Sequence, residues 1–259
     1  MTSKVYEALN TAWKSTSKIL FGTDIGELNE FEPYLKGGVI GKTVKSHFSG
    51  NPLWVASAQY EEHAKFFDFN AEQSKIAAIA AKPINIDKIK DIDSLLSETE
   101  ERFIYSGNKT LGNSKYIEHS DAVVDSTGVL NSSIVVRGKY VAYSYLKRDV
   151  GYAFACTSSG ESEYLIRCFY NNTLKRCFEA CTSVGSADCY FVYNIIGCSD
   201  CLFTFNVRSK RHMIGNVQLT KEQYLPLKQK LISEIAEKLK SKKKLDYSII
   251  DLVNGSAKE

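Results

Sequence analysis

The sequence predicts a mainly β protein: a single-stranded parallel β-solenoid with an N-terminal α+β cap and a C-terminal helix. The main evidence is a three-residue repeat that runs from Leu111 to Val207. Of the 33 positions in one phase of this repeat, 31 are small or aliphatic, and the exceptions are Lys147 and Asn171. The stretch contains 15 aromatic and 17 charged residues, and Lys147 is the only one of them in this phase. Two helices, one near each end of the chain, complete the predicted architecture.

The period of three distinguishes this fold, because an α-helix repeats every 3.6 residues and a flat strand every 2. A polyproline bundle also has period three, but it requires Gly at its crowded position. In a β-solenoid, short parallel strands stack coil on coil, and the narrow core accepts only small side chains. Ser alternates with aliphatic residues between Ser114 and Ser144, and three such hexads predict a coil of about 18 residues. The predicted inward ladder comprises Ser114, Ile117, Ser120, Val123, Ser126, Val129, Ser132, Val135, Cys168, Cys189, Cys198 and Cys201.

The N-terminal segment predicts an amphipathic helix over residues 3–20. Ser3 is a suitable N-cap, and Val5, Leu9 and Trp13 fall on one face. This helix packs either on its own domain or, as an arm, on a neighbouring subunit, and the sequence leaves both possibilities open. The predicted division of the chain is a helix or arm at 1–24, the cap at 25–105, the solenoid at 106–217, and a C-terminal helix and tail at 218–259.

A second helix is predicted to follow the repeat. Thr220 and Gln223 have the spacing of a capping box, in which each side chain bonds the other residue's backbone N–H. The helix reaches about Lys240 and presents one apolar face, made of Leu227, Leu231, Ile232, Ile235 and Leu239. Both ends of a solenoid expose strand edges, so we expect the flanking segments to cover them.

The composition is that of an ordinary soluble protein, with 259 residues, 44% hydrophobic and 24% charged. A net charge of +3 is too small to favour nucleic acid or an acidic membrane as a partner. No apolar run approaches the ~18 residues of a membrane span, and no apolar segment of a secretion signal follows Met1. We therefore expect a protein made in the cytoplasm, which stays there or joins a particle assembled there. No cofactor is expected, because a phosphate-binding loop ending in Gly41-Lys42-Thr43 would need Gly five residues before Gly41, and that position is Lys36.

All seven cysteines lie in the repeat, and Cys181 is the one outside the inward phase. Taken alone, Cys198 and Cys201 form a Cys-x-x-Cys pair, which is half of a zinc site or a redox dithiol. Because both fall in the inward phase, where Cys exchanges with Ser, Ala and Val, we interpret them as small core residues. Bound metal and disulfides remain the alternatives, although free thiols suit a reducing compartment.

The aromatic residues of the repeat all lie outside the inward phase. Stacked coils bring equivalent positions about 4.8 Å apart, so these rings are expected to form ladders. Either the N-terminal region covers them, or they face a partner, because exposed aromatic rows are typical of interfaces. The residues predicted to form an interaction surface are Tyr140, Tyr143, Tyr152, Tyr170 and Tyr193.

Two parts of the chain resemble an uncharacterised Cys/Ser-rich β-solenoid repeat family of uncultured bacteria and their viruses. The first is residues 53–55 (Leu-Trp-Val) followed by 66–69 (Phe-Phe-Asp-Phe). The second is 198–201 (Cys-Ser-Asp-Cys) leading to 208–216 and the helix start at 220–224 (Thr-Lys-Glu-Gln-Tyr). Members often begin with a zinc ribbon, and this chain has no Cys before Cys156, so that part is absent. The resemblance implies the solenoid fold and no particular activity.

Three functional hypotheses follow from the sequence. The first is a non-enzymatic structural or interaction protein, acting as an assembly component of a viral particle or another large complex, with a protein partner or self-association. The second is a left-handed β-helix acyltransferase, for which His119 is the only weak catalytic candidate. Gly follows no inward aliphatic residue between Ser114 and Ser144, which departs from the pattern of those enzymes. The third is a solenoid that binds carbohydrate along its aromatic face.

Overall fold

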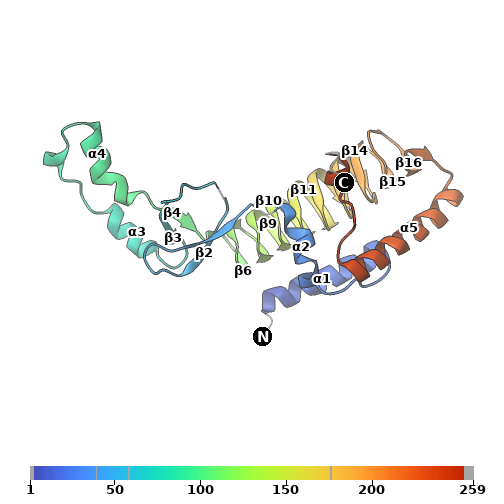
Figure 1. Cartoon of the computed structure of the whole chain (residues 1–259), viewed down its shortest axis with the longest axis horizontal. Coiled ribbons are helices and arrows are strands. Elements are labelled where there is room, and N and C mark those ends of the chain that lie inside the picture. The colour runs from blue at the N-terminus through green and yellow to red at the C-terminus, as the bar shows by residue number, and fades with distance from the viewer. Residues whose placement is uncertain (1–2, 39, 58, 176, 254–259) are drawn as a thin grey trace.

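An elongated β-solenoid forms the middle of the molecule in the computed structural model, which describes residues 3–38, 40–57, 59–175 and 177–253 (Figure 1). A cap lies at one end of the solenoid, and helices from both ends of the chain run along its side. The fold predicted from the three-residue repeat is therefore confirmed.

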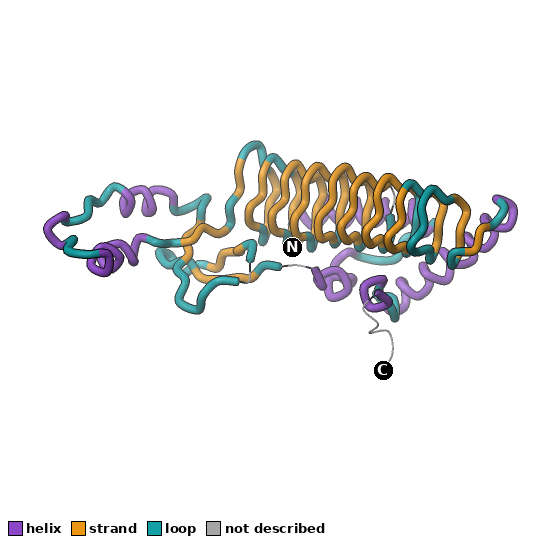
Figure 2. The backbone as a smooth tube through the Cα atoms, turned by 90° about the horizontal axis from the view of Figure 1, so that it is seen from above, coloured by secondary structure: helices purple, strands orange, loops and turns teal. Residues whose placement is uncertain are grey.

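The solenoid strands pair in parallel, coil after coil, as the row of rungs in Figure 2 shows. The last strand, β17, departs from this pattern and pairs antiparallel with β16. The strands are β5 (Thr110–Leu111), β6 (Lys115–Glu118), β7 (Asp121–Val124), β8 (Thr127–Leu130), β9 (Ser133–Ala142), β10 (Tyr145–Ala153), β11 (Cys156–Leu165), β12 (Cys168–Lys175), β13 (Ala180–Ala187), β14 (Val192–Ile196), β15 (Ser199–Leu202), β16 (Arg211–Ile214) and β17 (Val217–Gln218).

One coil takes 12 residues, so the 18-residue coil inferred from the hexads is wrong. Lys115 pairs with Thr127, and Thr127 in turn pairs with Lys139. The reason is a corner at every third residue, where the backbone enters the left-handed region, as at Tyr116 (φ 57°) and His119 (φ 44°). Four such corners close a coil of two hexads. A left-handed non-glycine residue costs about 1–2 kcal/mol, which the rest of the coil must offset.

The inward serines hold neighbouring coils together. The Ser126 hydroxyl donates to the Val124 carbonyl at 2.7 Å and accepts the Gly138 N–H at 2.9 Å, one coil later. Ser132 repeats this arrangement and accepts the Ser144 N–H at 3.1 Å. Because the corners turn these N–H groups inward, a side-chain acceptor satisfies them where no carbonyl is in reach. Ser126 and Ser132 thus complete the hydrogen bonding of their own coil and of the next.

The inward cysteines take part in the same pattern. The thiols of Cys189, Cys198 and Cys201 donate to carbonyls two residues earlier, at 3.1, 3.4 and 3.3 Å. These thiols therefore occupy the geometry of the Ser hydroxyls as weaker donors, in addition to filling the core. Among the predicted inward residues, Ser114 and Ile117 in the first coil are half-buried, and the side chain of Cys168 lies outside the described part. The others are buried: Ser120, Val123, Ser126, Val129, Ser132, Val135, Cys189, Cys198 and Cys201.

Helices from both ends of the chain cover one outer side of the solenoid. That side presents a column of outward residues spaced one coil apart, which includes Leu130, Phe154 and Phe178. Trp13 packs edge-on against Phe154 with ring centroids 5.2 Å apart, and Phe21 does the same against Phe178 at 5.0 Å. The covering elements are α1 (Lys4–Phe21), η1 (Leu28–Phe31), α2 (Glu32–Leu35), η2 (Lys36–Gly38), α5 (Lys221–Lys242) and α6 (Ile249–Val253). The N-terminal helix thus packs on its own chain.

The cap consists of two small sheets and a helical projection. Its elements are β1 (Lys42–Lys45), β2 (Pro52–Val55), β3 (Phe66–Asp68), α3 (Gln73–Ala80), η3 (Ile86–Lys88), α4 (Ile92–Thr99), η4 (Glu100–Arg102) and β4 (Tyr105–Gly107). The sequence analysis assigned residues 25–105 to the cap. In the structure, Ile25, Leu28 and Phe31 pack with α1 on the solenoid instead, because their apolar side chains complete the core under that helix.

Asn216 and β17 close the far end of the solenoid. The Asn216 side-chain amide accepts the Phe205 N–H and donates to the Phe205 carbonyl, both at 2.9 Å. A side-chain amide thus takes the place of a further strand at this point. The predicted capping box at Thr220 and Gln223 is also present and starts α5.

Replacing Ser126 with Ala should lower the free energy of unfolding by about 1–3 kcal/mol, because the buried Gly138 N–H and Val124 carbonyl lose their partner. Ser126→Cys should lower the free energy of unfolding by less than Ser126→Ala does. Cys198 occupies the same column further along the solenoid, and its thiol donates to the Ile196 carbonyl, two residues earlier. Urea unfolding of the two variants measures the difference. Equal stability of the Ala variant and the native protein would show that the hydroxyl adds nothing to coil stacking.

Candidate functional site

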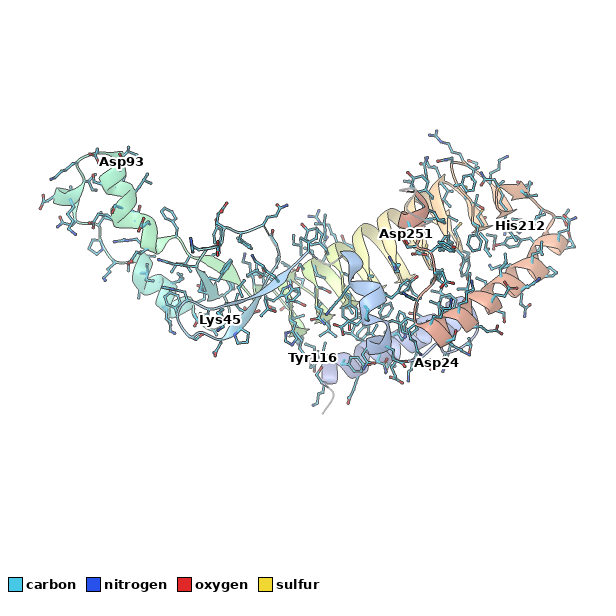
Figure 3. The ribbon with its side chains drawn as sticks, viewed as in Figure 1. Asp24, Lys45, Asp93, Tyr116, His212 and Asp251 are labelled. Atoms are coloured by element: carbon cyan, nitrogen blue, oxygen red, sulfur yellow. The ribbon has the colours of Figure 1, made fainter. Side chains whose placement is uncertain are left out.

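The cap carries a helical arm, residues 73–103, that lies at the tip of the molecule (Figures 1 and 3). It contains α3, η3, α4 and η4, and no residue of the arm is buried. Its large apolar side chains face solvent: Ile86 is 80% exposed, Phe103 70%, Ile92 66% and Leu96 52%. These exposed apolar side chains make the arm a candidate interaction surface.

The arm is ordered by polar contacts rather than by a core. Asp91 caps α4 by accepting the Ser94 N–H at 2.8 Å, and the Ser94 hydroxyl accepts the Asp91 N–H at 3.0 Å. That backbone N–H of Ser94 holds the pKa of Asp91 below its usual value. Lys88 and Glu98 pair across the arm at 2.9 Å. These contacts preform the arm, and each is exposed and contributes little stability.

The predicted tyrosine surface is largely taken up within the chain. Tyr143 is 2% exposed, and its hydroxyl donates to Glu32 at 3.4 Å, so the prediction that it faces a partner is wrong. It lies in the outer side that α1 covers, which the repeat alone cannot indicate. Tyr140 and Tyr193 are half-buried and pack against the same core. The side chains of Tyr152 and Tyr170 lie outside the described part of the chain.

The uncovered sides of the solenoid expose apolar residues as well. Phe205 is 50% exposed, Leu146 45%, Val184 44% and Ile196 37%. They are spread over several coils rather than gathered in one patch, and only Val184 and Ile196 stand one coil apart among these four. Scattered exposed apolar residues are common on protein surfaces and carry less information than the helical arm.

His119, the weak catalytic candidate, lines a cavity of about 520 Å³ where the cap meets the first coils. We call this the junction cavity. Asp68 also lines it, but that carboxylate already accepts the backbone N–H groups of Asn70 and Ala71 and the Asn108 amide. In the described part of the chain, no carboxylate is hydrogen-bonded to His119. A catalytic imidazole is normally oriented by such a partner, so this geometry adds no support for His119 as a catalytic residue.

Cys198 and Cys201 are buried inside the solenoid and have free thiols. Within residues 3–38, 40–57, 59–175 and 177–253, no group of three or more His, Cys, Asp or Glu side chains could hold a metal ion. Because the coil turns at every third residue, Cys198 and Cys201 lie on two successive sides of one coil, and both point inward. Both thiols donate to backbone carbonyls in the core.

A buried polar cluster lies where α2 and α6 meet the solenoid. Glu179 is fully buried, and its carboxylate lies 3.4 Å from the Arg167 guanidinium without hydrogen-bond geometry. Arg167 stacks on the Tyr34 ring at 4.2 Å and donates to the Tyr34 carbonyl at 3.1 Å. Burial raises the pKa of Glu179 to about 7, Arg167 opposes this rise, and Asp251 adds to it. Burial also raises the pKa of the Tyr34 hydroxyl, Glu179 adds to this rise, and Arg167 opposes it.

Neither the arm nor this polar cluster is predicted from the sequence. Arg167 and Glu179 stand one coil apart, so a search for charged pairs at that spacing would have found them once the coil length was known. The arm has an apolar face, with Ile92 and Leu96 four residues apart, but a face of this kind equally suits a helix packed on its own domain. Only the fold shows that nothing in the described chain covers it.

The class of protein that this fold defines is a β-solenoid repeat protein with helices along one side and a capped end. No protein-family model, no curated protein and no solved structure matches the chain. Among the described helices, none combines the length and the apolar character needed to cross a membrane.

Glu179 makes a pH-dependent contribution to stability. Its folded pKa of about 7 lies above the ordinary value of 4.5, so the folded state holds a proton that the unfolded state releases between these values. The contribution is therefore greatest below about pH 4.5 and is lost as the pH rises through about 7. Relative to Glu179→Gln, the native protein should lose up to about 3 kcal/mol of unfolding free energy between about pH 5 and 8.

Urea unfolding at several pH values measures this difference. Glu237→Gln, a change at an exposed position on α5, is the matched control and should leave the pH profile unchanged. Parallel pH profiles for the native protein and Glu179→Gln would show that Glu179 is ionised in the fold at neutral pH.

Proposed function

We propose that the protein is a non-enzymatic interaction protein, in which the β-solenoid is a rigid rod that holds the helical arm toward a protein partner. The observation that carries the proposal is the arm itself, which has no buried residue and exposes Ile86, Ile92, Leu96 and Phe103. Helices of this length are marginal in water without tertiary packing. A second protein surface would supply the packing that the arm lacks.

The mode of contact that suits the arm is a helix in a groove. In that mode an amphipathic helix places side chains at i, i+3 and i+4 into an apolar groove. On α4, Ile92, Leu95 and Leu96 have this spacing. The flanking charges on Asp93, Lys88 and Glu98 suit a polar rim, and they limit non-specific association.

The solenoid supports this role because it is stiff along its length. Neighbouring coils are tied together by strand pairing and, at positions such as Ser126 and Ser132, by inward Ser hydrogen bonds. α1 and α5 brace one outer side along several coils. A rod of this kind fixes the distance and direction of the arm relative to the rest of the chain. We therefore place the protein in a larger assembly, such as a viral particle or another complex, built from copies of this chain or with other proteins.

Light scattering on the purified protein tests the proposal. We expect a native mass above the 29.0 kDa of one chain, because exposed arms of separate copies can bury each other's apolar side chains. The double substitution Ile92→Glu and Leu96→Glu should lower the mass to that of one chain. The matched control is Leu225→Glu with Leu227→Glu on α5, which changes leucines of similar exposure far from the arm.

Hydrogen exchange separates the remaining outcomes. If the chain is monomeric at all concentrations and the amides of α3 and α4 exchange rapidly, the arm needs a different protein, and self-association is excluded. If the chain is monomeric and those amides are as protected as amides of the solenoid, the arm is stable on its own and the proposed function is wrong.

A further inference from the structure

β6, the strand of the first coil that ends at Glu118, has an open edge. In the described part of the chain it pairs with β8 and with no other strand. Strands inside the solenoid have partners on both sides: β9 pairs with β7 and β8 of the coil before and with β10 of the coil after. A strand edge of this kind can accept a further strand from another chain.

The edge is open because the chain comes from the cap and forms no coil before this first one that could pair with β6. Tyr105 stands one coil before Ile117 and would take the preceding inward position if the coil continued. Instead, β4 pairs with β3 in the cap, with Tyr105 opposite Phe66. The ring of Tyr105 packs there against Tyr60, with centroids 4.9 Å apart. A side chain as large as Tyr also does not suit the narrow inward column.

The neighbouring edges of the same end are closed by the cap. Asn108 accepts the Trp54 N–H at 2.8 Å, and Asp121 accepts the N–H groups of Ala56 and Lys109 at 2.9 and 2.7 Å. Asn70 bonds to the backbone next to β5. These side chains and β2 take the place of the missing coil on two sides of the first coil. Among the described residues, no strand or side chain of the cap hydrogen-bonds to the outer edge of β6 in this way, although Ser3 ahead of α1 donates to the Glu118 side chain.

The junction cavity lies directly against this edge. Its volume of about 520 Å³ is within the roughly 300–1,000 Å³ of typical ligand sites. One wall is the edge itself, residues 117–120, and the opposite wall is formed by Trp54, Asp68 and Asn70 of the cap. Tyr116, at the corner within β6, is 61% exposed and lies at the cap end of the solenoid (Figure 3). The cavity thus gives an incoming chain access to the open strand.

We propose that the junction cavity binds an extended peptide segment of a protein partner, which adds to β6 as a parallel strand. The inward column that it would continue runs through Ile117, Val129 and Val141, so the peptide would place a small aliphatic side chain over Ile117. Backbone hydrogen bonds give affinity in this mode of binding, and the pocket for that side chain gives selectivity. A second copy of this chain stacked head to tail cannot supply the strand, because Asn216 and β17 close its far end.

This inference goes beyond the proposed function, since peptide binding at β6 does not depend on the helical arm. The probe is a capped synthetic peptide with the sequence of residues 125–133, Asp-Ser-Thr-Gly-Val-Leu-Asn-Ser-Ser, which contains the strand that pairs with β6 on its other edge. At about ten times its dissociation constant, the peptide should slow the fastest-exchanging amides of residues 115–118 about tenfold. It should also change the fluorescence of Trp54, which lines the cavity.

Two controls make the result decisive. A peptide with the same sequence and N-methyl groups on alternate residues cannot form the ladder and should not bind. The variant Ile117→Glu should lose binding, whereas Val217→Glu, on the exposed β17 at the other end, should retain it. Absence of protection with about 1 mM peptide, or equal protection by the N-methylated peptide, would overturn the inference. Neither result would change the native mass of the protein or the hydrogen exchange of the helical arm. The proposed function is therefore tested separately.

Discussion

The structure depends on a left-handed corner at every third residue and on the inward side chain that each corner requires. Corners at residues such as Tyr116, His119 and Asp125 turn the chain so sharply that four of them complete a coil. The conformation is unfavourable for residues other than Gly, so it persists only where the surroundings stabilise it. Strand pairing between coils, the Ser hydroxyls that accept N–H groups of the next coil, and the packed aliphatic residues provide that stabilisation together.

The 12-residue coil then determines which outward side chains lie next to each other on the surface of the solenoid. Residues one coil apart stack at the spacing of paired strands, about 4.8 Å. This places Arg137 beside Asp149, Asn194 beside Asn206, and Arg167 beside Glu179. It also aligns the aromatic and aliphatic column on which α1 and α5 pack. The covered side, the polar cluster and the corner ladders therefore all follow from the length of one coil.

The two ends of the rod differ in a way that suits a role in assembly. The far end is sealed by β17 and Asn216, which prevents copies from adding there as further coils. The near end carries the cap, with an arm that has no core of its own and a first coil that is only partly covered. Among the described residues, the helical arm and the open edge of β6 thus occur together at one end of the rod.

The sequence alone determined the solenoid, because a period of three with Ser, Cys and aliphatic residues at the inward position fits neither an α-helix, nor a flat strand, nor a polyproline bundle that requires Gly there. It also indicated that Cys198 and Cys201 are core residues, and it predicted that Thr220 caps the helix that became α5. It could not give the coil length, because a period of three is compatible with any multiple of three. Nor could it show that Tyr143 is covered, that Glu179 is buried, or that β6 is open. Burial and strand pairing depend on which distant segments come together, and only the tertiary structure decides that.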